Sequence, residues 1–196
     1  MRWRTIALEM IARTILWRRI DLAGHEACRL YGVDDEWRLE GTAVFSHEDR
    51  ACGLSYLIAC DASWNTLSGT VSGWLGNKLV NIELAVDEQR RWKMNGVSQA
   101  QVDGCVDLDL NFSPATNLLP VRRLGLEVGE SAEVKAAWLR FPSFELEPFA
   151  QVYTRVDEST YRYSSSDGEF VADLTVDDVG FATAYPGFWE AERSSE

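Results

Sequence analysis

The chain has 196 residues, of which 46% are hydrophobic and 26% are charged, so it can bury a core and lacks the composition of a disordered chain. Its 31 acidic and 19 basic side chains give a formal net charge of −12, which argues against nucleic acid or an anionic membrane surface as a partner, because both select positive charge. The length predicts one domain.

The first residues carry positive charge, as an export signal does, but Glu9 and Arg13 interrupt the apolar stretch that follows. No apolar run approaches the ~18 residues that a membrane span needs. We therefore expect a cytoplasmic protein with no membrane span.

Strand signals dominate the chain. Short stretches rich in Val, Ile, Trp, Tyr and Phe are separated by clusters of Gly, Asp, Asn and Ser, which is the pattern of an antiparallel β meander. Pairs such as Asn95-Gly96 and Asp103-Gly104 tolerate positive φ and predict tight turns, and glycine-rich residues 68–76 are predicted to hold a hairpin turn. The predicted strands span residues 14–20, 26–31, 37–45, 53–60, 66–71, 81–86, 91–94, 106–112, 151–155, 160–163, 170–176 and 181–185.

One short helix is predicted at residues 118–124. Asn117 can serve as its N-cap, and Pro120 falls at the third helical position, where no intrahelical N–H bond is lost. Gly125 then offers a left-handed exit. Residues 131–139 contain the alanines of a helix, but Val134, Trp138 and Phe141 also fit a strand, so both alternatives stay open there.

The sequence shows no pattern for a metal or a cofactor. The two histidines, His25 and His47, are not part of an H-E-x-x-H motif and are predicted to lie in surface loops. Neither a Walker loop nor a dinucleotide fingerprint is present. The four cysteines form no C-x-x-C pair and are predicted to be free, buried thiols: Cys28, Cys52, Cys60 and Cys105.

Alternation in residues 106–112 places Asp107 and Asp109 together on one face of a strand, about 6.8 Å apart. Such a pair fits the acid and base of an inverting glycosidase or a site for a hard cation. The simpler interpretation is a wet strand face on which the carboxylates are solvated or ion-paired with Arg122 and Arg123.

The two arginines favour a structural role for these aspartates. Consecutive residues of a helix point about 100° apart, so we expect one of Arg122 and Arg123 to pair with Asp107 or Asp109. The two positive charges are expected to lower the pKa of both carboxyl groups. A general acid needs a raised pKa, and we therefore predict no catalytic residue.

Aromatic side chains are plentiful, with eight Trp, eight Phe and six Tyr. Amphipathic rings suit a pocket that holds a lipid chain or stacks on a sugar, although core packing also uses them. Trp138, Tyr153 and Tyr161 are the candidates for ligand contact.

Several motifs together form a specific pattern: Asp103-Gly104-Cys105-x-Asp107-x-Asp109, the run from Ser113-Pro114 to Glu130-Ser131, Tyr153-Thr154-Arg155, Tyr161-Arg162-Tyr163, Trp17-Arg18-Arg19 and Ala184-Tyr185-Pro186-Gly187. In these residues the sequence resembles the Putative glycolipid-binding family of bacterial proteins. The resemblance implies a mainly β fold, a spiral β-roll in which a long, largely antiparallel sheet is wrapped around a single central helix. It implies an N-terminal extension at residues 1–13, one domain at residues 14–190 and a disordered tail at residues 191–196.

The sequence is compatible with three functions. The first is a non-enzymatic module that binds a glycolipid or another apolar small molecule in an aromatic-lined cleft between sheet and helix. The second is a hydrolase acting on a sugar or ester through Asp107 and Asp109, and the third is a protein-interaction scaffold with a packed interior. The first hypothesis is favoured, with these ligand-binding residues: Arg122, Arg123, Asp107, Asp109, Trp138, Tyr153 and Tyr161.

Overall fold

The computed structural model describes residues 10–165 and 168–192, and 61% of the structure is strand. Residues 1–9 of the predicted extension and residues 193–196 of the predicted tail lie outside the described residues. The strands are β1 (Met10–Arg19), β2 (Gly24–Val33), β3 (Glu36–His47), β4 (Arg50–Cys60), β5 (Thr66–Leu75), β6 (Lys78–Val86), β7 (Trp92–Met94), β8 (Val97–Ser98), β9 (Asp107–Leu110), β10 (Ser131–Arg140), β11 (Glu145–Arg155), β12 (Thr160–Ser165), β13 (Phe170–Val176), β14 (Ala182–Tyr185) and β15 (Trp189–Ala191).

All described strands belong to one sheet, in the order β8-β7-β6-β5-β4-β3-β2-β1-β15-β14-β13-β12-β11-β10-β9. From β1 to β8 and from β10 to β15, strands that are consecutive in sequence pair antiparallel through short turns, as the meander pattern predicted. The two halves of the meander join where β1 pairs with β15, with Trp17 opposite Ala191. The predicted mainly β, largely antiparallel sheet is therefore confirmed.

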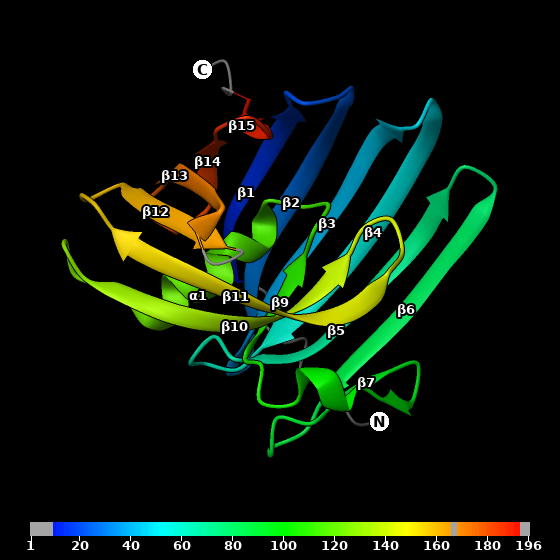
Figure 1. Ribbon diagram of the computed structural model, residues 1–196, viewed down its shortest axis with the longest axis horizontal. Helices are drawn as coiled ribbons and strands as arrows, with labels where there is room; N and C mark the ends of the chain where they lie inside the picture. Colours follow the sequence, from blue (N-terminus) through cyan, green and yellow to red (C-terminus); the bar gives the residue numbers. More distant parts are fainter. Residues whose placement is uncertain (1–9, 166–167, 193–196) are drawn as a thin grey trace, which may run out of the picture.

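The pair β9–β10 is the exception, because it is parallel. A parallel pair needs a crossover connection, and residues 111–130 supply it. This connection contains α1 (Leu118–Leu124), preceded by the 3₁₀ turn η2 (Ala115–Asn117). In Figure 1, α1 lies between the broad part of the sheet formed by β1 to β6 and strands β10 and β11, which cross in front.

Helix α1 spans the predicted residues and ends at Gly125, whose φ of 54° is the predicted left-handed exit. Asn117 precedes the helix, but its side chain makes no capping hydrogen bond to α1. Its Nδ2 instead donates to the Pro114 carbonyl oxygen, and its Oδ1 accepts from the Tyr153 hydroxyl. Of the two alternatives left open for residues 131–139, the strand is correct, because these residues form β10 between β9 and β11.

The helix packs into both apolar clusters of the core. Leu118 and Leu119 belong to the larger cluster, which β1 to β6 supply with residues such as Trp17 and Ile58. Val121 belongs to the smaller cluster, with residues of β10 to β13 such as Leu174. The four cysteines are free and buried, as predicted. Within the described residues, no helix is both long and apolar enough to span a membrane.

Candidate functional site

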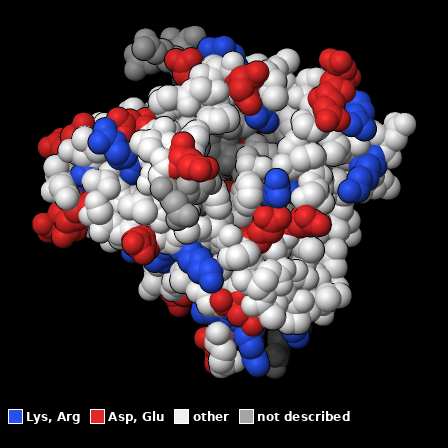
Figure 2. All heavy atoms as spheres, viewed as in Figure 1, with Lys and Arg blue, Asp and Glu red and all other residues white. Residues whose placement is uncertain are grey.

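A cavity of about 370 Å³ lies between the two halves of the sheet, within the usual size of small-molecule sites. Its walls come from the ends of β1 and β3, from β9 and the segment before α1, and from β10 to β15. Figure 2 shows that the viewed face of the molecule is hollowed near its centre, with acidic and basic side chains scattered around the hollow. Ten aromatic side chains line the cavity: Phe45, Phe112, Trp138, Phe141, Phe149, Tyr163, Phe170, Tyr185, Phe188 and Trp189.

The rings pack against one another in two groups. Trp138 of β10 stacks on Phe149 of β11, with ring centroids 4.6 Å apart. The second group surrounds Tyr185, whose centroid lies 5.3 Å from Phe188 and 6.2 Å from Tyr163. Such edge-to-face and stacked pairs hold the rings in fixed orientations, so the cavity has preformed walls.

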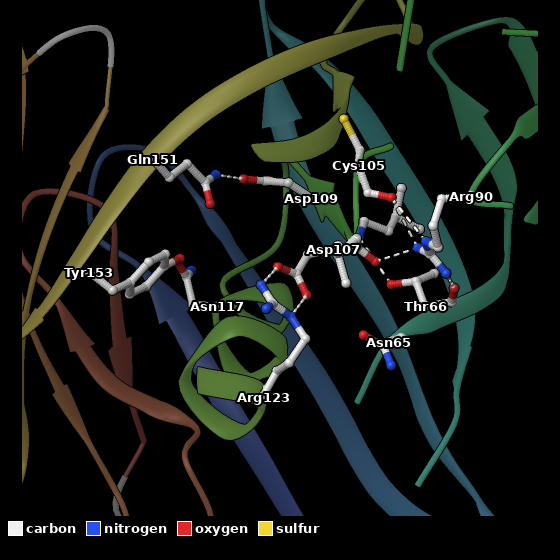
Figure 3. Close-up of polar contacts among 12 residues, drawn as sticks. Asn65, Thr66, Arg90, Cys105, Asp107, Asp109, Asn117, Arg123, Gln151 and Tyr153 are labelled. Carbon is white, nitrogen blue, oxygen red and sulfur yellow. Dashed lines mark hydrogen bonds and ion pairs between the residues drawn. The ribbon is translucent and has the colours of Figure 1, made fainter. Parts of the chain in front are cut away.

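Asp109 is the acidic side chain of the cavity wall. Its Oδ2 accepts a hydrogen bond of 2.5 Å from Nε2 of Gln151, which reaches across from β11 (Figure 3). Burial raises the pKa of Asp109 to about 6; the hydrogen bond from Gln151 opposes this rise, and the negative charge of Asp107 adds to it.

Asp107 lies behind the cavity wall and is 2% exposed. Both of its oxygens are bound by Arg123 of α1, at 3.0 Å from Nε and 2.5 Å from Nη2 (Figure 3). The predicted arginine–aspartate pair is thus confirmed, with Arg123 and Asp107 as its members. The bidentate pair ties the crossover helix to β9.

Two expectations about this strand are wrong. The aspartates do not lie on a wet face, because both faces of β9 are covered: Leu108 and Leu110 pack in the larger cluster, while Asp107 faces α1. The arginines do not lower both pKa values, because burial dominates and raises the pKa of Asp107 despite Arg123. Asp109 has a neutral amide, rather than an arginine, as its partner.

Arg90 fixes the position of β9 from the other side. Its guanidinium donates to the carbonyl oxygens of Thr66, Cys105 and Val106, at distances from 2.6 to 3.2 Å. The Thr66 hydroxyl oxygen accepts from the backbone N–H of Leu108. These bonds join the start of β5 to β9 (Figure 3), so Asp109 projects from a strand that is anchored at both sides.

Sequence reasoning missed a third buried carboxyl group, Glu26 of β2, beside the cavity. Its Oε1 accepts from the hydroxyl groups of Tyr56 at 2.6 Å and Ser113 at 2.5 Å, and Ser113 lines the cavity. Burial raises the pKa of Glu26 from 4.5 to about 7, against the opposing hydrogen bonds and Arg19. Alternation along the strand could have indicated that Glu26 is buried, because Glu26 shares its strand face with Cys28 and Leu30.

The structure separates the seven predicted ligand-binding residues. Asp109 and Trp138 line the cavity. Tyr153 lies behind the cavity wall, and its hydroxyl donates to Asn117, which lines the cavity. The Asp107–Arg123 pair also lies behind the wall. Arg122 and Tyr161 instead line a separate pocket of about 240 Å³, and Arg122 lies over the ring of Trp64.

The histidines also differ from the expectation of surface loops. His25 is exposed, but it belongs to β2, and His47 ends β3 and lines the cavity, where its ring packs edge-on against Phe141. Among residues 10–165 and 168–192, no three His, Cys, Asp or Glu side chains are grouped to hold a metal ion.

Comparisons with known proteins find one matching family and similar solved structures. The model of a family described as "Putative glycolipid-binding" matches residues 14–191. A DUF1089 family protein from Pseudomonas aeruginosa has a similar crystal structure, with a TM-score of 0.76 and 28% sequence identity over 97% of each chain. A β-barrel-like protein of the domain of unknown function DUF1849 from Brucella abortus shares the fold, with a TM-score of 0.52 and 8% identity over 91% of this chain and 94% of that one. The search of curated proteins found no match.

Proposed function

Because the chain belongs to the Putative glycolipid-binding family, we propose that it is a non-enzymatic binding protein whose cavity holds a glycolipid or another small amphiphile. The observation that carries the proposal is the cavity of about 370 Å³ with ten aromatic side chains in its wall. Apolar walls with a few polar groups are typical of ligand sites. The volume favours this function over a scaffold with a packed interior.

We further propose that the sheet forms the spiral β-roll that the family resemblance implies, wound around α1. The contribution of α1 to both core clusters supports this arrangement. In it, the helix holds the two halves of the sheet apart at one end, and the cavity is the space that remains between them. The proposal keeps the cytoplasmic location, which the four free, buried cysteines support.

The hydrolase alternative requires Asp107 and Asp109 to act together on one substrate. Only Asp109 lines the cavity, and both oxygens of Asp107 are engaged by Arg123. This arrangement favours a structural role for Asp107. The unmodified protein and the variants Asp107→Asn and Asp109→Asn are assayed with chromogenic glycosides and esters. Turnover that disappears in either variant, while the fold stays intact, would support the hydrolase hypothesis.

Filling the cavity tests the proposed function. Leu22 lines the cavity, so Leu22→Trp adds a large ring there. The matched control is Leu79→Trp, because Leu79 is 83% exposed on β6. Binding of dodecyl maltoside and of the neutral dye N-phenyl-1-naphthylamine is measured by calorimetry and fluorescence.

We expect Leu22→Trp to raise the dissociation constant at least ~10-fold, while Leu79→Trp binds like the unmodified protein. Melting temperatures verify that both variants fold. Equal binding by the two variants, or no binding by the unmodified protein, would contradict the proposed function.

A further inference from the structure

Most polar side chains of the cavity wall are already bonded to the protein. Asn117 uses Oδ1 to accept from Tyr153 and Nδ2 to donate to the Pro114 carbonyl oxygen. The Ser113 hydroxyl donates to Glu26 and accepts from the backbone N–H of Ala115. These groups have little capacity left for the many hydroxyls of a sugar, each of which needs its own partner.

Asp109 is different, because its bonding capacity is only partly used. A carboxylate offers four acceptor positions, and the one hydrogen bond that the Asp109 carboxylate makes within the described residues is the bond from Gln151 to Oδ2. Its Oδ1 remains available to a ligand in the cavity that Asp109 lines.

The charge of Asp109 also lacks a counter-ion among the described residues. Of the two arginines of the neighbouring helix, Arg123 is held by both oxygens of Asp107 and Arg122 lies over the ring of Trp64. Arg19 is the one lysine or arginine among the described residues of the wall, and Asp21 holds it with hydrogen bonds of 3.0 and 2.7 Å. The cavity therefore has an unbalanced negative charge.

Aromatic rings share the cavity with this carboxyl group. Tyr163, Phe170, Tyr185 and Phe188 all line it, and their neighbouring centroids lie between 5.3 and 6.3 Å apart. Burial, and then the negative charge of Asp109, raises the pKa of Tyr163, as expected for a carboxylate close to that ring. Ring faces attract a cation through their quadrupole, most strongly where water is excluded.

We infer that the cavity binds the cationic nitrogen of an amine or quaternary ammonium group, placed between Asp109 and the rings of Tyr163, Phe170, Tyr185 and Phe188. This inference rests on the proposed function, since the same ligand fills the rest of the cavity with its apolar part. A carboxylate or phosphate headgroup would meet the charge of Asp109 and is disfavoured.

The test compares three probes with the same twelve-carbon chain: dodecyltrimethylammonium, dodecyl maltoside and dodecanoate. Each is titrated below its micelle concentration by calorimetry at pH 8, which lies above the pKa of about 6 of Asp109. We expect the ammonium probe to bind ~10-fold or more tightly than the maltoside, and dodecanoate to bind most weakly.

Two variants that each remove one negative charge separate a site from general attraction to an acidic protein. Asp109→Asn is expected to lose the ~10-fold preference for the ammonium probe over the maltoside. Asp173→Asn alters an exposed residue of β13 that pairs with Arg162, and it is expected to keep the preference.

The outcomes distinguish the inference from the proposed function. If the maltoside binds as tightly as the ammonium probe, or if Asp109→Asn and Asp173→Asn behave alike, the cationic site is wrong and the binding function stands. If none of the three probes binds, both are wrong.

Discussion

Glu26 keeps a carboxyl group in the core at 1% exposure, and its Oε2 has no hydrogen-bond partner in the described part of the chain. The surrounding strands are built to receive it. Gly41 of β3 leaves room for Tyr56, because a Cβ at residue 41 would lie 2.4 Å from the Tyr56 hydroxyl oxygen. An ionised carboxylate in this place costs free energy that the two hydroxyl donors offset only in part.

The raised pKa of Glu26 predicts a fall in stability as the pH rises. In the folded protein this pKa is about 7, against 4.5 when unfolded, so between these values the folded state binds the additional proton. Stability therefore decreases from about pH 4.5 to 7 and levels off above, by ~3 kcal/mol from this group. In Glu26→Gln, the free energy of unfolding measured in urea should fall by ~2–3 kcal/mol less between pH 5 and pH 8 than it does in the unmodified protein.

The control for this measurement is Glu83→Gln, which removes a carboxyl group from an exposed position of β6. Asp109, whose pKa is raised to about 6, also lowers the free energy of unfolding as the pH rises. It does so at lower pH than Glu26 and equally in every variant. Identical pH profiles for Glu26→Gln and the unmodified protein would show that Glu26 is not a buried, titrating group.

The Asp107–Arg123 pair supplies a prediction about buried charge. Arg123→Gln leaves Asp107 buried without its cation, and we expect this variant to lose ~3 kcal/mol of unfolding free energy. Adding Asp107→Asn should recover part of that loss, because the unpaired charge is then removed. Chemical denaturation of the two single variants and the double variant gives the coupling energy.

The exposed pair Arg162–Asp173, with side chains 55% and 48% exposed, is the comparison, and Arg162→Gln should lower the free energy of unfolding far less than Arg123→Gln does. A coupling energy near zero for Asp107 and Arg123 would refute the view that this pair anchors α1 to β9.

At the scale of the elements, the sequence patterns predicted most strands and the helix. The strand prediction failed where a glycine is needed because another chain segment packs closely against it. Residues 68–76 were predicted to hold a hairpin turn, yet β5 runs through Leu75. These glycines serve tertiary packing rather than a turn. A Cβ at Gly69 would lie 2.7 Å from Leu108 Cδ2, and one at Gly73 would lie 2.0 Å from the Gly53 carbonyl oxygen. β15 was missed because three residues show no readable alternation.

Glycine in β3 gives a prediction at this scale. Gly41→Ala places a methyl group against Tyr56 and the Ala27 carbonyl oxygen, and overpacking of this kind costs ~1–3 kcal/mol. Gly32→Ala in β2 is the matched control, since its nearest neighbour would be 3.7 Å away. Equal stability of the two variants in urea would contradict the close packing at Tyr56.

At the scale of the whole molecule, the decisive contacts join residues that are far apart in sequence. The pairing of β1 with β15 and the parallel pairing of β9 with β10 both depend on register over long separations, which strand periodicity does not encode. The cavity follows from these pairings. Asp109 and Trp138 could be named from the sequence, whereas rings such as Phe170 and Phe188 reach the same wall only because β1 pairs with β15.

Native mass spectrometry of the freshly purified protein shows whether this cavity holds a ligand. We expect a defined added mass on the unmodified chain, or on the chain mixed with the ammonium probe. That mass should be retained in Leu79→Trp and lost in Leu22→Trp, which fills the cavity. A bare chain under both conditions, or an adduct that Leu22→Trp retains, would contradict a ligand-binding cavity.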